Sequence, residues 1–495
     1  MKVLLIDPPF KRFTGFTNFY FPVGLGYLAA VLRQRGHKVR IFDVDAAQKG
    51  SDIDFSDEYL RLELYVKGLQ EAGHPVWAEI ARVLEQYRPD VVGITAITTK
   101  FGSVLKTAQV CKEALPDAFI VVGGPHATAN PGQAIAIPQI DYVVRGEGEK
   151  IFPELLSVLQ EGKDPASVRG LTFQKDGQVI HTGQPNPIED LDTVPFPARD
   201  LLMNPQNYTS EDMGVIMSSR GCPFGCTYCF HMFDRRVRYR SVDNVIAELR
   251  HVRDVYGTRQ FAFKDDSFTV NRERVAALCE AIIREDLQIN WDCTTRANLL
   301  DDALLELMVK AGCNSIKIGV ETGSERILRE TSKGVSLDDI RRAARLLNRQ
   351  GVFWSAYFMI GLPTETEEDI LATHRFMKEL NPYYCGLGVY NPFPNTPLFA
   401  QGVEMGLLQP DVQPEHFYTT NPKDYFFVDP ARRVRNLEPA RFAELARFMM
   451  SAFHKHNTRL RNVFRRAWAR RKAYTREPRL LWSDGRKALR WLARI

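Results

Sequence analysis

The 495-residue sequence contains no run of 18 apolar residues, which is roughly the length that a membrane-spanning helix requires. At the amino terminus, the apolar stretch from Val3 to Ile6 ends at Asp7 and two prolines, too early for a secretory signal. This stretch predicts a β-strand instead. With 44% hydrophobic and 25% charged residues, the chain has the composition of a globular protein, and we expect a cytoplasmic location.

Cysteine is scarce, with 8 residues in the chain, and no disulfide framework is expected. Five cysteines lie singly in apolar helix or strand patterns, where cysteine usually serves as a small buried side chain. These five are Cys111, Cys279, Cys293, Cys313 and Cys385. The other three form one group, Cys222, Cys226 and Cys229, with the spacing C-x3-C-x2-C.

No fourth cysteine follows this group closely, although an electron-transfer cluster normally binds four. Three thiolates can bind three irons of a [4Fe-4S] cluster and leave the fourth iron open for a ligand. Gly221 and Gly225 permit the tight turns that such a loop requires. Two alternatives are three buried structural cysteines and a zinc site, for which His231 is badly placed as fourth ligand. We predict an iron-sulfur cluster with one open iron.

From residue 1 to 165, short apolar runs alternate with amphipathic helical patterns. The expected strands span residues 3–6, 39–42, 91–97, 119–122 and 142–144, and the expected helices span 24–35, 76–87 and 101–114. This alternation predicts a doubly wound, Rossmann-like α/β domain, whose ligands bind at the carboxyl ends of the strands. Residues 166–212 predict a small ribbon followed by a proline-rich linker.

A second alternation covers residues 213–395. The expected strands span residues 214–217, 261–263, 290–294, 315–320, 354–360 and 386–390, and the expected helices span 241–256, 274–284, 303–310, 337–349 and 367–380. Six strand-helix repeats predict a partial (β/α)6 barrel, in which chemistry gathers at the carboxyl ends of the strands. The three grouped cysteines fall at such an end. Residues 396–495 are predicted to form a helical C-terminal extension.

The chain's net charge of +5 comes from its carboxyl-terminal tail, because residues 455–495 hold 14 Lys and Arg against two acidic residues, a local charge of +12. An apolar helix face lies among these cations: Leu460, Val463, Phe464, Ala467 and Trp468, continued by Leu480, Leu481, Trp482, Leu489, Trp491 and Leu492. This pattern favours an anionic membrane surface. A solvated face packed on the barrel is the main alternative, and nucleic acid is the third.

The cysteine loop, residues 221–230, resembles the signature of radical S-adenosylmethionine (SAM) enzymes, C-x3-C-x-aromatic-C, with Tyr228 in the aromatic position. The resemblance implies that SAM binds the open iron and is cleaved by one electron to a 5′-deoxyadenosyl radical. It also implies an electron donor, such as a flavodoxin, a ferredoxin or another reductase. The implied SAM contacts are Tyr228 and the strand-end residues Asp265, Arg296, Glu321, Ser324 and Gly361.

The N-terminal domain resembles the cobalamin-binding domain of B12-dependent radical SAM enzymes, through residues 24–29, 92–95, 123–126 and 145–149. The D-x-H-x-x-G motif, whose histidine ligates cobalt in many B12 proteins, is absent, so no axial ligand is predicted. The resemblance implies cobalamin contacts at Thr95, Thr98, Gly123, Gly124, His126, Gly146 and Glu147. A vestigial domain without cofactor is the alternative.

These resemblances imply a cobalamin-dependent radical SAM enzyme, for which methylation of an unactivated carbon is the commonest activity. A cyclase or oxidoreductase without methyl transfer is the first alternative. A tRNA methylthiotransferase is disfavoured because the N-terminal domain has only Cys111, and a non-enzymatic cobalamin carrier or sensor is disfavoured by the intact cysteine loop. The tail favours a lipid or other natural product as the small-molecule substrate, met at the inner membrane surface, rather than nucleic acid.

Overall fold

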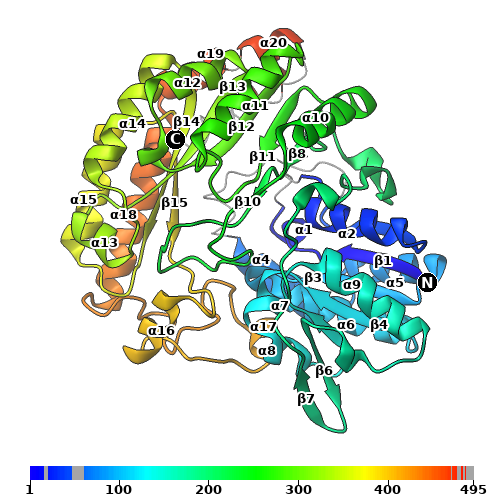
Figure 1. Cartoon of the computed structure of the whole chain (residues 1–495). Coiled ribbons are helices and arrows are strands. Elements are labelled where there is room, and N and C mark those ends of the chain that lie inside the picture. Colours follow the sequence, from blue (N-terminus) through cyan, green and yellow to red (C-terminus); the bar gives the residue numbers. More distant parts are fainter. Residues whose placement is uncertain (16–19, 47–60, 470, 477–480, 483–484, 486–495) are drawn as a thin grey trace.

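The computed structural model describes residues 1–15, 20–46, 61–469, 471–476, 481–482 and 485. Figure 1 shows two sheet-containing units, the N-terminal domain in blue and cyan and the second unit in green and yellow. Every strand and helix that the two alternations predict is present, within a few residues at each end. None of the described helices has the length and apolar character needed to span a membrane.

The N-terminal sheet has the strand order β2-β1-β3-β4-β5-β6-β7. Its strands are β1 (Lys2–Asp7), β2 (Lys38–Asp43), β3 (Val91–Thr95), β4 (Phe119–Gly123), β5 (Tyr142–Val144), β6 (Leu171–Lys175) and β7 (Gln178–His181). The first five pair in parallel, as the doubly wound prediction requires. The predicted ribbon is the pair β6 and β7, which continues this sheet in antiparallel fashion along β5.

Helices cover both faces of the N-terminal sheet, and successive residues of β1 alternate between two cores. Leu4 and Ile6 belong to one core, whereas Val3 and Leu5 belong to the other. This arrangement explains the continuously apolar sequence of β1, because a parallel strand is buried on both faces. The helices are α1 (Lys11–Thr14), α2 (Val23–Gln34), α4 (Leu62–Gln70), α5 (Pro75–Tyr87), α6 (Phe101–Ala114), α7 (Pro125–Ala129), α8 (Pro131–Ile135) and α9 (Gly148–Gln160).

The second sheet is open and all parallel, with the order β15-β14-β13-β12-β11-β8. Its strands are β8 (Val215–Ile216), β11 (Gln260–Phe263), β12 (Asn290–Thr295), β13 (Cys313–Glu321), β14 (Phe353–Ile360) and β15 (Tyr384–Val389). Because β15 does not pair with β8, the predicted partial barrel is confirmed. Its helices are α10 (Val242–Tyr256), α11 (Arg272–Arg284), α12 (Asp302–Lys310), α13 (Glu325–Glu330), α14 (Leu337–Gln350) and α15 (Glu367–Leu380).

The two faces of this sheet differ in chemistry. Alternate strand residues such as Trp291, Ile316 and Trp354 are fully buried against the helices and form the barrel's core. The residues between them point to the opposite side, which we call the inner face. It carries polar side chains, among them Asp292, Lys317 and Tyr357 of β12, β13 and β14.

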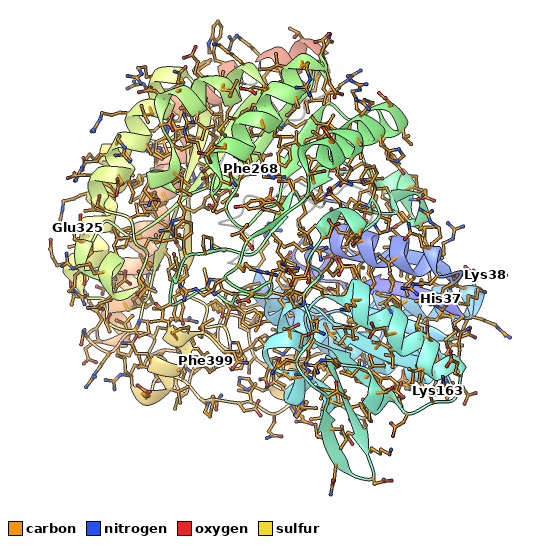
Figure 2. The ribbon with its side chains drawn as sticks, viewed as in Figure 1. His37, Lys38, Lys163, Phe268, Glu325 and Phe399 are labelled. Carbon is orange, nitrogen blue, oxygen red and sulfur yellow. The ribbon has the colours of Figure 1, made fainter. Side chains whose placement is uncertain are left out.

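The C-terminal extension packs on both units. Helices α16 (Pro397–Glu404) and α17 (His416–Thr419) lie against the N-terminal domain, where Phe399 (Figure 2) and Phe417 join one of its two cores. The longer α18 (Pro439–Thr458) packs instead on β15, where the Asn457 side chain exchanges hydrogen bonds with the backbone of Cys385. Helices α19 (Leu460–Ala469) and α20 (Arg471–Arg476) follow.

Candidate cofactor-binding site

The cysteine loop lies at the carboxyl end of the second sheet, directly after β8. A short antiparallel ribbon of β9 (Ser219–Arg220) and β10 (Arg238–Tyr239) closes the base of the loop. Gly221 has a φ of 99°, and a Cβ atom there would lie 2.5 Å from the carbonyl oxygen of Arg236. A side chain at this position would therefore prevent the loop from closing, which explains the glycine in physical terms.

The three cysteine sulfurs lie in a cationic environment. The Nη1 atom of Arg296 approaches the Cys226 Sγ atom at 3.5 Å. A hydrogen bond from Cys229 lowers the pKa of Cys226 to about 5, and the charges of Lys333 and Arg296 also lower it, against the opposing effect of burial. The same hydrogen bond, together with burial, raises the pKa of Cys229. Cys226 is therefore ready to act as a thiolate ligand at neutral pH.

The loop fits a cluster better than a single ion. Among the described residues, no three His, Cys, Asp or Glu side chains converge on one metal ion, as a structural zinc site would require. In a [4Fe-4S] cube each cysteine binds a different iron, so the sulfurs need not converge on one point. Two of the three cysteines remain accessible, because Cys229 is exposed and Cys222 is partly exposed, whereas Cys226 is buried.

Asp265, predicted as a SAM contact, accepts hydrogen bonds from within the protein. Its buried carboxylate accepts hydrogen bonds from the Ser218 backbone at 2.9 Å, the Ser218 hydroxyl at 3.1 Å and the Ser219 hydroxyl at 2.7 Å. Because these serines directly precede Arg220 and the cysteine loop, Asp265 anchors the loop to the end of β11. The strand-end position was predicted correctly, but the hydrogen bonds from the two serines already engage the carboxylate.

Three predicted SAM contacts lie around the cysteines. The Arg296 guanidinium stacks over the Phe224 ring of the loop at 3.7 Å. Glu321 forms an ion pair with Lys333 at 2.8 Å, and the Lys333 ammonium lies 6.0 Å from the ring of Tyr228. Glu321 has a φ of 68°, which is rare outside glycine, and it lies at a register shift where β13 meets β14. Such local strain is frequent at ligand sites.

The other two predicted SAM contacts make internal hydrogen bonds. Ser324 is the N-cap of α13, and its hydroxyl donates to Asp369 at 2.5 Å. The backbone amide of Gly361 donates to the buried carboxylate of Glu365 at 2.5 Å. The sequence reasoning missed Lys333, which pairs with Glu321 and lowers the pKa of Cys226. Lys333 follows a helix rather than a strand, so strand-end patterns gave no signal for it.

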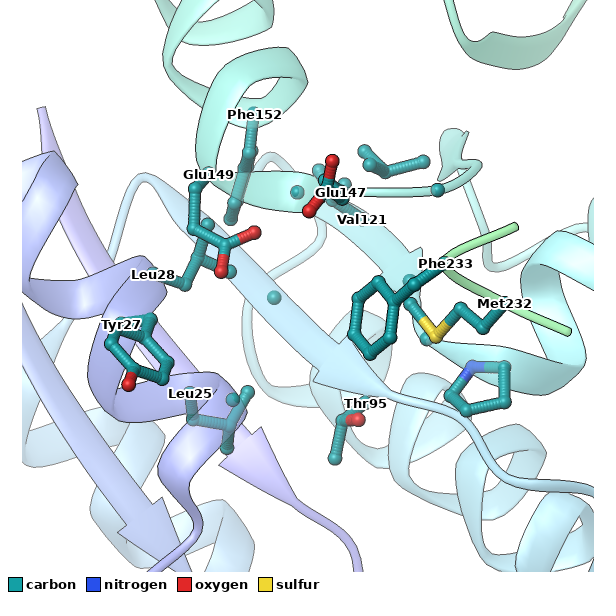
Figure 3. A pocket seen from close by; sticks show the side chains of 18 of the residues that line it. Leu25, Tyr27, Leu28, Thr95, Val121, Glu147, Glu149, Phe152, Met232 and Phe233 are labelled. Atoms are coloured by element: carbon teal, nitrogen blue, oxygen red, sulfur yellow. The ribbon is translucent and has the colours of Figure 1, made fainter. Parts of the chain in front are cut away.

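A pocket opens between the two units at the carboxyl ends of β3, β4 and β5 (Figure 3). Thr95, Gly123, Gly124, Gly146 and Glu147, five of the predicted cobalamin contacts, line it from the N-terminal domain. Met217, Arg220, Met232 and Phe233 line it from the cysteine-loop side, and no histidine is among the lining residues. Six of the lining residues are glycines, which bring the backbone itself to the pocket wall. The pocket thus lies where a Rossmann-like domain binds its ligand, at the carboxyl ends of the strands, which suits cobalamin.

The wall of this pocket includes a buried ion network that joins the two units. Arg220, the residue before Gly221, donates to Glu147 at 2.6 Å and to Glu149 at 2.5 Å. Arg238 of the adjoining ribbon strand donates to Glu147 at 2.8 Å. Burial opposes the ionisation of Glu147, yet the hydrogen bonds from the two arginines keep its pKa below the ordinary value. Glu147 is thus a structural anchor as well as a pocket-lining residue.

The structure does not bring Thr98 and His126 into this pocket. His126 is fully buried, and its ring nitrogens contact the Thr98 hydroxyl and the Gln133 side chain, each at 3.1 Å. Its ring also packs on Phe101, with 3.9 Å between the ring centroids. Burial lowers the pKa of His126 to about 3, so the ring stays neutral in the core. The adjacent glycines made these positions look like ligand contacts, but the side chains point into the protein.

Comparisons with known proteins agree with this geometry. The chain matches the model of the radical SAM superfamily over residues 216–377 and that of the B12 binding domain over residues 14–156. It is 33% identical over 462 residues to the uncharacterized methyltransferase PH0819 of Pyrococcus horikoshii, covering 92% of each chain. It is 30% identical over 412 residues to the anaerobic magnesium-protoporphyrin IX monomethyl ester cyclase of Rubrivivax gelatinosus, covering 81% of this chain and 70% of the cyclase.

A solved structure shares the fold. The radical SAM methyltransferase TsrM of Kitasatospora setae, with cobalamin and a [4Fe-4S] cluster bound, superposes with a TM-score of 0.67 at 19% identity. The match covers 91% of this chain and 88% of TsrM. The fold, the family models and the 33% identity over nearly the whole chain agree, and this protein belongs to the B12-dependent radical SAM enzymes, which use a [4Fe-4S] cluster, SAM and cobalamin.

Proposed function

We propose that this enzyme transfers a methyl group from cobalamin to an unactivated carbon of a small molecule. The observation that carries the proposal is the pocket between the two units, in which strand ends of the B12-binding domain face residues next to the cysteine loop. Similarity to PH0819 over 92% of both chains supports the same activity. When bound, the cluster and SAM supply the radical that removes hydrogen, and cobalamin supplies the methyl group.

Residues of the protein bind the cluster and cobalamin and limit their contact with water. In the proposal Cys222, Cys226 and Cys229 bind the cluster, and the cations Arg296 and Lys333 offset the negative charge of the thiolates. The cobalamin pocket is lined largely by apolar side chains, among them Leu28, Phe152 and Phe233. Such lining limits the access of water and so protects reactive groups from side reactions. The electron donor is a flavodoxin, a ferredoxin or another reductase.

The test is an analysis of the products that the anaerobically reconstituted full-length enzyme forms from SAM. With hydroxocobalamin, strong reductant and a candidate substrate, methylation yields both S-adenosylhomocysteine and 5′-deoxyadenosine. The rival activity, cyclisation or oxidation, is favoured by the 30% identity to the Rubrivivax cyclase and would yield 5′-deoxyadenosine alone. Absence of both nucleosides under strong reductant would contradict any radical activity.

The exposed face of α19 supports contact with an anionic membrane. Leu460, Phe464 and Trp468 recur every four residues and are 58%, 69% and 69% exposed. Side chains at this spacing share one helix face, and Arg461 flanks it, whereas Arg465 stacks on the Tyr383 ring at 4.0 Å. In this proposal the face rests on an anionic bilayer, from which a lipid-like substrate reaches the enzyme. Of the apolar residues predicted to continue this face, Leu480, Leu489, Trp491 and Leu492 lie outside the described residues.

We expect the triple variant L460S/F464S/W468S to lose most of its binding to anionic liposomes. Because the three side chains are exposed, their replacement should change the stability of the fold little. Burial of each in the bilayer interface, in contrast, contributes about 1.5–3 kcal/mol to the free energy of membrane binding. Co-sedimentation with phosphatidylserine-containing vesicles measures the effect. A matched control is Val428→Ser, which also removes an exposed apolar side chain, 61% exposed, outside the tail. Equal sedimentation of wild type and triple variant would overturn this proposal.

A further inference from the structure

The inner face of the second sheet carries a row of cationic and hydroxyl groups that are not among the predicted cofactor contacts. Ala262 of β11 pairs with Asp292 of β12, so Lys264, two residues further on, lies level with Thr294. Thr294 in turn pairs with Lys317 of β13. The row Lys264, Thr294 and Lys317 therefore crosses three neighbouring strands, which lie side by side in Figure 1. With strands about 4.8 Å apart, the two lysine backbones are roughly 10 Å apart.

The side chains of this row lie on the face of the sheet opposite the helix-covered core. Their sequence neighbours Phe263, Cys293 and Ile316 are fully buried on the helix side, so the alternation of a strand directs the row to the inner face. Thr294 is exposed although it lies in an interior strand of the sheet, and Lys264 is exposed at the end of β11. These groups are therefore accessible to a ligand.

The charges of the row do not balance. Lys317 forms an ion pair with Asp292, whereas no carboxylate among the described residues pairs with the Lys264 ammonium. The Lys264 ammonium lies over the ring of Tyr20, 4.6 Å from its centroid. Desolvation by the surrounding protein and the charge of Lys317 lower the pKa of Lys264, and the carboxylate of Asp292 only partly opposes them. An anion beside Lys264 would stabilise its charged form and so oppose both the desolvation and the repulsion from Lys317.

The row lies where a substrate must lie. Lys264 adjoins Asp265, which anchors the cysteine loop. Tyr20 precedes α2 by only three residues, and Gly24 and Leu25 of α2 line the cobalamin pocket. Along β13, Lys317 lies four residues before the predicted SAM contact Glu321, about 13 Å along the strand. An anion bound here would therefore lie between the cluster loop and the cobalamin domain.

We propose that Lys264, Thr294 and Lys317 bind an anionic group of the substrate, a carboxylate or a phosphate. Two ammonium groups and a hydroxyl suit either anion through charge-assisted hydrogen bonds. This inference rests on the proposed function, because it identifies the substrate class of that site. According to this inference, the substrates are amphiphilic or polar acids, and neutral hydrocarbons are excluded.

Calorimetric titration of the full-length enzyme tests the inference without turnover. The enzyme carries its cluster and cobalamin, is saturated with SAM without reductant, and is titrated separately with inorganic pyrophosphate and with benzoate. We expect at least one anion to bind, and the double variant K264Q/K317Q to bind it about tenfold more weakly or worse. Lys264→Arg keeps the charge and should stay within about threefold of wild type. Lys310→Gln removes an exposed lysine on α12 and serves as the matched control.

Three results would overturn the inference: neither anion binds the wild type, the double variant binds as well as the wild type, or, in a parallel experiment in which the anion is bound before SAM is added, SAM displaces the anion. The third result would assign the lysines to the SAM carboxylate. Measuring S-adenosylhomocysteine and 5′-deoxyadenosine in parallel samples of the same enzyme, supplied with strong reductant and a candidate substrate, keeps the two proposals distinct. Anion binding without these products would refute the proposed methyl transfer and leave the anion site intact.

Discussion

Replacing Cys226 with alanine should abolish SAM cleavage, lowering 5′-deoxyadenosine formation by at least about 1,000-fold, or roughly 4 kcal/mol of transition-state stabilisation. Cys226 is the most acidic of the three thiols, because Cys229 donates a hydrogen bond to it and two cations lie nearby. Without its thiolate, one iron of the cube loses its protein ligand and the cluster does not assemble. Iron content, the visible absorbance of the cluster and 5′-deoxyadenosine formation measure the loss.

The same variant should keep its cobalamin, because no cysteine lines the pocket between the two units. Cobalamin retention therefore separates loss of the cluster from loss of the fold. Cys279→Ala is the matched control, since Cys279 is a buried cysteine of α11 outside the loop. This control should retain iron and SAM cleavage. A Cys226→Ala enzyme that still contained a full cluster would refute the proposed ligand set.

Replacing Arg220 with methionine should destabilise the folded protein by about 3–5 kcal/mol, the usual cost of leaving a buried charge without its partner. The side chains of Arg220 and Glu147 are each 5% exposed, and that of Glu149 is 11% exposed. The change leaves Glu149 without its arginine and removes one of two arginines from Glu147. Because Arg220 also lines the pocket and adjoins the loop, iron and cobalamin contents should both fall.

Chemical unfolding measures the stability change, and metal and corrin analysis of the purified protein measures the two cofactors. Arg236→Met is the matched control, because it breaks the exposed Arg236–Glu189 pair, whose contribution should stay below about 1 kcal/mol. The double variant R220M/E149Q removes both charges of one pair and should recover part of the loss. A stability change below about 1 kcal/mol for Arg220→Met would show that the network does not join the units.

The sequence was sufficient to predict both sheets and the cysteine loop, because these follow from local patterns of apolar residues and from residue spacing. It also indicated which strand ends meet at the site, since parallel strands share one edge. Side-chain partners could not be predicted. Asp265, Ser324 and His126 all lie near predicted ligand positions, but their polar atoms are bound by other parts of the protein. Lys333 and Arg220 form ion pairs with residues that lie elsewhere in the sequence, Glu321 and Glu147. No local sequence pattern reveals such pairs.

The return of α16 and α17 to the N-terminal domain has a consequence for the order of folding. Phe417 packs on Phe101 of α6, 4.9 Å between ring centroids, and the Gln133 amide donates to the carbonyl of Val412 at 3.1 Å. A ribosome must therefore synthesise the whole barrel before the first domain can bury Phe101 fully. During translation, the core of the first 212 residues stays incomplete until α16 and α17 have been made. A fragment that ends at residue 212 therefore lacks part of its hydrophobic core. The cobalamin domain becomes complete only when nearly the entire chain has been made.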